Sequence, residues 1–137
     1  MMAGDGLITV ESRFGVTETI DRLAEVVKRA GLLVFARIDH AAGARDVGAS
    51  LRPTELLIFG NPRGGTPLMQ DSQLAGIDLP VKALGWEDEQ GQVWLSYDDP
   101  HWIAERHGLG EASSEAVAAI AASMEKVIAA AAGMDQS

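Results

Sequence analysis

The chain has no cysteine among its 137 residues. Disulfide bonds, thiolate metal sites and cysteine nucleophiles are therefore excluded. Positive charge is also scarce, because 11 Lys and Arg residues stand against 20 Asp and Glu residues and give a formal net charge of −9. Since this charge repels phosphate backbones and no basic run offsets it, we expect no nucleic-acid partner.

Long hydrophobic runs are missing as well. A bilayer-spanning helix needs about 18 or more consecutive apolar residues, and the sequence contains no such stretch. The first residues, Met1 to Thr9, have no basic segment and no apolar run of signal-peptide length. These features predict a cytoplasmic protein without a membrane partner.

The sequence does contain enough apolar residues for a core. Its hydrophobic fraction is 47%, and a chain of this length can bury on the order of two thirds of its unfolded surface without disulfides or metal. No internal repeat or linker interrupts it. We therefore expect residues 1–137 to form a single domain.

Apolar periodicity in the first half predicts strands separated by a helix. Strands are expected at 7–13, 32–39 and 54–59, and a helix capped by Thr17 is expected to end near Gly31. This helix is long enough to connect two neighbouring parallel strands. The strand at 54–59 is apolar on both faces, which suits a central position in the sheet.

Later segments alternate between helices and a hairpin. Residues 41–48 predict a helical turn, and 67–75 predict a short helix that ends at Gly76 with Leu74 pointing inward. Strands at 81–88 and 92–97 flank a glycine-bearing turn, and their antiparallel pairing would bring two tryptophans together.

Two helices are expected to close the chain. Asp99 and Pro100 are typical of a helix start, and Gly108 ends that helix. The last helix spans about 114–132 with one apolar stripe. Together the elements indicate one α+β domain.

Several spaced motifs resemble those of the family catalogued as domain of unknown function 302. The similarity covers roughly Leu7 to Leu109 and rests on Ile38-Asp39-His40, Phe59-Gly60-Asn61-Pro62, Leu68-Met69, Leu79-Pro80-Val81-Lys82 and the segment from Trp94 to Pro100. The resemblance implies a two-layer α+β fold in which helices back a curved, mainly antiparallel sheet, in the order β-α-β-β-α-β-β-α-α. It also implies a tendency to homodimerise and no established activity. The C-terminal helix, within residues 111–134, lies outside the pattern.

A candidate ligand site follows the strand that ends at Gly60. Asn61 and Arg63 lie in a glycine-bearing loop whose backbone N–H groups could receive an anion, although a structural turn explains the same residues. Lys82 is the only lysine or arginine between Arg63 and Arg106, and it shares a strand face with Leu84. We therefore expect Asn61, Arg63 and Lys82 to bind a small polar or anionic ligand. The alternative for Lys82 is an ordinary strand lysine that pairs with a carboxylate or reaches water.

Asp39 and His40 are the candidate catalytic residues. An imidazole next to a carboxylate can carry a proton near neutral pH, but Asp39 can equally cap the turn that follows. His101 and His107 are six residues apart on one helix and point to different faces, so no metal site is predicted. A mixed site with His101 would require the fold to bring it to His40.

Three functional hypotheses follow from these residues. The leading hypothesis is a dimeric, noncatalytic binding domain without a cofactor. The second is an enzyme in which His40 transfers a proton while Lys82 and Asn61 stabilise negative charge. The third is an assembly protein that uses the last helix and the aromatic group for subunit contacts; that group consists of Trp86, Trp94, Tyr97 and Trp102.

Overall fold

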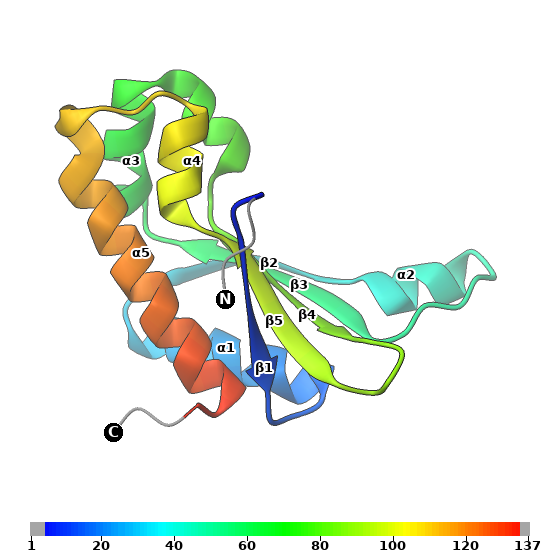
Figure 1. Ribbon diagram of the computed structural model, residues 1–137. Coiled ribbons are helices and arrows are strands. Elements are labelled where there is room, and N and C mark those ends of the chain that lie inside the picture. The colour runs from blue at the N-terminus through cyan, green and yellow to red at the C-terminus, as the bar shows by residue number, and fades with distance from the viewer. Residues whose placement is uncertain (1–4, 135–137) are drawn as a thin grey trace.

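A five-stranded antiparallel sheet forms the centre of the computed structural model, which describes residues 5–134 (Figure 1). The strand order across the sheet is β1-β5-β4-β3-β2, and every neighbouring pair is antiparallel. This arrangement confirms the predicted α+β class and antiparallel sheet. The strands are β1 (Leu7–Ser12), β2 (Leu33–Asp39), β3 (Thr54–Gly60), β4 (Lys82–Glu87) and β5 (Val93–Asp98).

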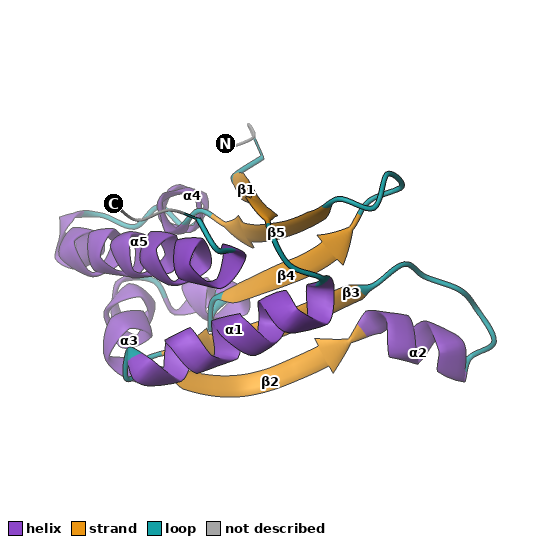
Figure 2. Cartoon of the chain, turned by 90° about the horizontal axis from the view of Figure 1, so that it is seen from below, coloured by secondary structure: helices purple, strands orange, loops and turns teal. Residues whose placement is uncertain are grey.

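Helices pack on one face of this sheet (Figure 2). Helix α1 lies against β2, β3 and β4, while α5 lies against α1, α3 and β1. The opposite face of the sheet has no helical layer. The helical elements are α1 (Val16–Arg29), α2 (His40–Asp46), α3 (Pro62–Asp71), the 3-10 helix η1 (Gln73–Asp78), α4 (Pro100–Arg106) and α5 (Glu111–Ala132).

The main core lies between the sheet and helices α1 and α5. Ile20, Leu23 and Val27 recur at three- and four-residue steps on α1 and are fully buried. Burying each such side chain contributes about 1.5–3 kcal/mol. Alternate strand residues, including Leu57 and Phe59, face these helices. The predicted helix is therefore confirmed, although Gly15 rather than Thr17 is its N-cap residue.

The predicted parallel pairing of the first two strands is wrong. β1 and β2 occupy opposite edges of the sheet. The β4–β5 hairpin forms as expected, and β2 pairs with β3, so β1 finds its partner in β5 instead. Helix α1 is long enough to cross beneath the intervening strands, and the helix length alone does not distinguish these two topologies.

The helix expected at 67–75 begins five residues earlier. Asn61 caps α3 by accepting a hydrogen bond from the Arg63 backbone N–H (3.0 Å), and Pro62 occupies the first turn. The glycines at 64 and 65 therefore lie inside a helix, where their small size permits close approach to neighbouring side chains. The chain leaves α3 at Ser72, and Leu74 on the following η1 is 76% exposed rather than inward.

A β-bulge changes which residues of β2 share a face. The register shifts between Val34, which pairs with Phe59, and Ala36, which pairs with Ile58. Val34 therefore lies on the helix-covered face, whereas Ala36 and Ile38 lie on the other face. The sequence alternation predicts Val34, Ala36 and Ile38 on one face, and this prediction is wrong because a bulge adds one residue to one strand.

Candidate functional site

A cavity of about 390 Å³ lies where β3 ends against α3 and α5. Phe59 and Val81 form its strand side, Met69 extends from α3, and Ile120 and Met124 extend from α5. Phe35, the residue at the β2 bulge, also lines it and is half exposed. The cavity walls are therefore mainly apolar.

Few polar groups reach this cavity. Asn61, Thr66 and Ser123 are the polar side chains in its lining, and among residues 5–134 no charged side chain contributes to it. Gly64 and Gly65 form part of the α3 wall and carry no side chain that would fill the cavity. A Cβ atom at Gly64 would lie 3.5 Å from Ile120, which is an ordinary van der Waals contact. These walls fit an uncharged molecule better than an ion.

The loop expected to present free N–H groups uses them within α3. The Gly64 and Gly65 N–H groups donate to the Asn61 carbonyl oxygen at 2.8 and 3.1 Å. The Arg63 N–H donates to the Asn61 side chain, and Pro62 has no N–H. The Arg63 side chain is exposed and does not line the cavity. The first turn therefore forms a capped helix start rather than an anion-binding nest.

Lys82 lies on the face of the sheet that has no helices. It alternates with Val81 and Ala83, which face the cavity and the core, and it pairs with Ile58. Its predicted placement with Leu84 on one strand face is confirmed. The structure does not bring Lys82 and Asn61 to the same cavity.

Asp39 and His40 lie at the opposite end of the β2–β3 pair from Asn61. Leu33 pairs with Gly60, next to Asn61, whereas Asp39 pairs with Glu55. Six residues of strand separate these ends, which corresponds to about 20 Å. Asp39 accepts a hydrogen bond from the Ala42 N–H (2.9 Å) and caps α2, which was the structural alternative. His40 is exposed and does not approach the cavity.

The histidines do not form a metal site within residues 5–134. No group of three or more metal-ligating side chains is present in this range. His101 is exposed on α4, far from His40 at the start of α2 (Figure 1). The proposed mixed site therefore does not form.

Sequence reasoning missed a polar cluster that joins η1 to α4. Asp78 is 8% exposed, and its carboxylate accepts two hydrogen bonds of 3.0 Å from Arg106. His107 Nε2 lies 2.6 Å from the same carboxylate. These residues are 28 or 29 positions apart in the sequence, so no local spacing indicates the contact.

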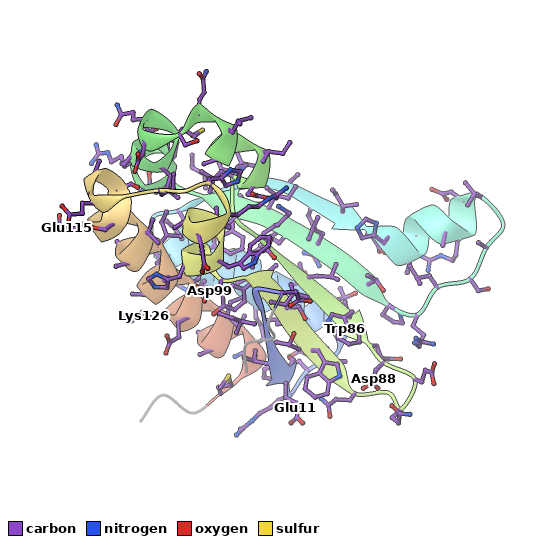
Figure 3. All side chains as sticks on the ribbon, turned by 45° about the horizontal axis from the view of Figure 1, so that its top comes forward. Glu11, Trp86, Asp88, Asp99, Glu115 and Lys126 are labelled. Carbon is purple, nitrogen blue, oxygen red and sulfur yellow. The ribbon has the colours of Figure 1, made fainter. Side chains whose placement is uncertain are left out.

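The predicted proximity of Trp86 and Trp94 is confirmed. Their ring centroids are 6.4 Å apart with planes inclined by 29°. The Trp86 indole N–H donates to Ser96, and that of Trp94 donates to Asp88, both at 2.9 Å. Figure 3 shows Trp86 and Asp88 close to the β4–β5 turn. These hydrogen bonds satisfy both indole N–H groups within the chain.

A protein-family model matches most of the chain. The model described as "Domain of unknown function DUF302" matches residues 8–131. The chain belongs to the DUF302 family. Its fold is shared with the crystal structure of a conserved DUF302 protein from Bacillus stearothermophilus. The comparison has a TM-score of 0.73 at 25% identity and covers 93% of this DUF302 chain and 96% of the other chain.

Two curated relatives are longer proteins. This DUF302 chain is 56% identical over 115 residues to the "Fluoride-specific ion channel FluC 1" of Brucella suis biovar 1, and the match covers 84% of the chain but 45% of the relative. The protein of the same name from Brucella abortus biovar 1 matches at the same identity, with 43% of its length covered. The chain thus spans less than half the length of these relatives. None of the helices in residues 5–134 has both the length and the apolar character needed to cross a bilayer.

Proposed function

We propose that this DUF302 protein is a noncatalytic binding domain that holds a small, uncharged and mainly apolar molecule. The observation that carries the proposal is the cavity between β3, α3 and α5. Its volume of about 390 Å³ lies within the range of roughly 300–1,000 Å³ that is usual for small-molecule sites. Asn61, Thr66 and Ser123 supply hydrogen-bonding groups that would orient the molecule.

The cavity favours an uncharged ligand over the polar or anionic one expected from the sequence. An anion would leave water for walls formed by side chains such as Phe59 and Ile120, without a cation among the described lining residues. Burying an unpaired charge in this way is costly. The net charge of −9 also repels anions at long range.

Binding of the neutral fluorescent probe N-phenyl-1-naphthylamine tests this proposal. Ala119 is exposed on α5 and lines the cavity, so Ala119→Trp would fill the opening. We expect this change to weaken probe binding at least tenfold. Ala118→Trp provides the matched control, because Ala118 is exposed on the same helix but does not line the cavity.

Substitution of Lys82 distinguishes the apolar cavity from the anionic site that was expected from the sequence. We expect Lys82→Ala to leave binding of the neutral probe unchanged, because Lys82 lies on the other face of the sheet. We also expect the sulfonated probe 8-anilinonaphthalene-1-sulfonate to bind more weakly than the neutral probe. Tighter binding of the sulfonate that is lost in Lys82→Ala would contradict the apolar cavity and support the anionic site.

The proposal includes a homodimer in the cytoplasm, as expected from the family resemblance and the sequence. The enzyme hypothesis receives less support, because His40, Asn61 and Lys82 do not converge. Sedimentation equilibrium measures the mass of the assembly, and fractionation of cells that express the chain measures its location. A membrane-bound pool after high-salt washing would contradict the cytoplasmic part.

A second candidate function is that of an accessory domain for fluoride channels. It is favoured by the 56% identity to part of two proteins named as fluoride-specific ion channels. Because the described helices do not suit a bilayer, we assign this chain a role beside the channel rather than in the ion path. Cells that lack the chain should grow less well than the parent strain on graded sodium fluoride but equally well on sodium chloride. Equal growth in fluoride would remove this candidate.

A further inference from the structure

The sheet face without helices is unusually apolar. We call it the open face and define it by the strand residues that alternate with the buried core positions. On β2, β3, β4 and β5 its apolar members are Ala36, Ile38, Leu56, Ile58, Leu84, Trp86 and Trp94, and its polar members are Thr54, Lys82, Ser96 and Asp98. Ile38 is 39% exposed, and the others are partly exposed.

An antiparallel sheet normally presents polar side chains on a face that remains in water. The open face instead presents branched aliphatic side chains beside the stacked Trp86 and Trp94. A contiguous apolar patch of this kind marks an interaction surface. The indole N–H groups donate within the chain, so the ring faces are available for packing.

We propose that a second copy of this chain covers the open face, so that two sheets pack face to face. This inference rests on the homodimer part of the proposed function and does not depend on the cavity. The sheet has five strands, and β4 has six residues. At about 4.8 Å between strands and 3.3 Å per residue, its footprint is roughly 480 Å² per copy. Two copies would bury about 1,000 Å², which is at the small end of specific interfaces.

The open face is complementary to itself about one twofold axis. Its middle row contains Ile38, Leu56 and Leu84, which pair across the strands. One flanking row contains Lys82, and the other contains Trp86 paired with Trp94. The same row continues through Ser96 to Thr9. An axis along it stacks each residue of the row on its own copy, aliphatic at the β2 end and polar at the β1 end, and places Lys82 above the tryptophan pair of the second copy. A lysine above an indole ring is favourable, and the second contact follows from the symmetry.

This arrangement gives the charge of Lys82 a specific partner, the tryptophan pair of the second copy. Within residues 5–134, it forms no ion pair with the acidic side chains around it. The opposite flank of the same face has no lysine or arginine that would repel it, because that row ends at Glu11 on β1. The face of a second copy therefore offers Lys82 the tryptophan pair as a partner without placing another cation against it.

Light scattering after size-exclusion chromatography, at loading concentrations from about 1 to 100 µM, tests the proposal. Wild type should shift with concentration from 14.5 kDa toward twice that mass. Ile38→Glu and Leu84→Glu should stay monomeric, with circular dichroism as the check on folding. Ile77→Glu is the matched control, because Ile77 is 73% exposed on η1 and is not one of the strand residues that form the open face.

The outcomes distinguish two questions: whether the chain forms a dimer, and whether the open face is the dimer interface. A wild-type monomer at every concentration would overturn both the homodimer and this interface. A dimer that persists in Ile38→Glu would overturn the face alone. If Leu84→Glu does not fold, Ile38→Glu still decides the question, because its side chain is more exposed and tolerates charge better.

The cation contact has its own readout. Lys82→Met keeps most of the side-chain length but removes the charge, and it should raise the dimer dissociation constant on the order of tenfold, given two lysine–indole contacts per dimer. Lys28→Met on the exposed side of α1 is the control and should change nothing. An unchanged constant in Lys82→Met would overturn the proposed axis.

Crosslinking locates the axis directly, because the chain has no native cysteine. Leu84→Cys should crosslink to its own copy with a short bis-maleimide. It should not form a direct disulfide, since packed sheets lie about 10 Å apart and a disulfide needs Cα atoms within about 7 Å. Ala118→Cys on α5 should remain uncrosslinked, and efficient crosslinking of that variant would contradict this arrangement.

Discussion

Tyr97 is the one residue whose environment gives a numerical expectation for its ionisation. It faces the helix-covered side of β5 and is 5% exposed. Burial, together with the negative charges of Glu125 and Asp99, raises the pKa of Tyr97 from its ordinary value of 10.0 to about 12. Because this is the only tyrosine in the chain, its titration can be measured without assignment.

We expect the folded protein to show one phenol ionisation near pH 12 when absorbance is followed at 295 nm. The unfolded chain loses this proton near pH 10, so between these values the folded state holds more protons than the unfolded state. The free energy of unfolding is therefore unaffected by Tyr97 below pH 10 and falls as the pH rises toward 12. Tyr97→Phe should remove that part of the alkaline loss, and a midpoint near pH 10 in the folded protein would contradict the burial.

The positions of single residues also show which features could be predicted from the sequence. Asp99 caps α4 as expected, and Lys82 lies on the predicted strand face. Both depend on local rules, namely the side-chain acceptor at a helix start and the two-residue period of a strand. Which side of the sheet carries the cavity depends on strand order and helix packing. Neither can be predicted from a single residue and its neighbours in the sequence. This is why Asn61 and Lys82 could not be separated before the fold was known.

Among the elements, α3 and η1 departed most from expectation. Adjacent glycines usually indicate a loop, yet Asn61 and Pro62 provide a strong helix start and the packing of α3 against α5 stabilises the rest. The 3-10 segment η1 buries the small side chain of Ala75 but leaves Leu74 and Ile77 exposed. Its position depends instead on the contact between Asp78 and α4.

We expect Asp78→Asn to destabilise the protein by about 2–3 kcal/mol, because it leaves the Arg106 charge and the buried His107 with a neutral partner. Arg106 is half exposed, so its share of this loss is reduced by water. Urea unfolding followed by tryptophan fluorescence measures the change. Asp46→Asn, at the exposed end of α2, is the control and should stay within about 0.5 kcal/mol. Equal stability of the two variants would show that the cluster does not fix η1.

At the scale of the whole molecule, the two faces of the sheet have different roles. The helix-covered face carries the core and the cavity, whereas we propose that the opposite face binds a second copy. Residues from the two groups alternate along the same strands, as Val81 and Lys82 do on β4. The antiparallel class could be expected from the family motifs, but the position of β1 beside β5 could not, because that pairing joins the first and the last of the five strands along the chain.

This division predicts that ligand binding and dimer formation are separable. Ile38→Glu changes the open face only, so we expect it to give a monomer that binds N-phenyl-1-naphthylamine with the wild-type dissociation constant. Ala119→Trp changes the cavity only, and we expect it to lose the probe while keeping the wild-type dimer. The cavity is lined by residues of one chain, and the sheet between the two sites is held by hydrogen bonds that neither substitution alters. Both statements are checked by titrating the probe into each variant and measuring the molar mass of the same samples by light scattering. Loss of probe binding in the Ile38→Glu monomer would show instead that the second copy shapes the cavity through the strands.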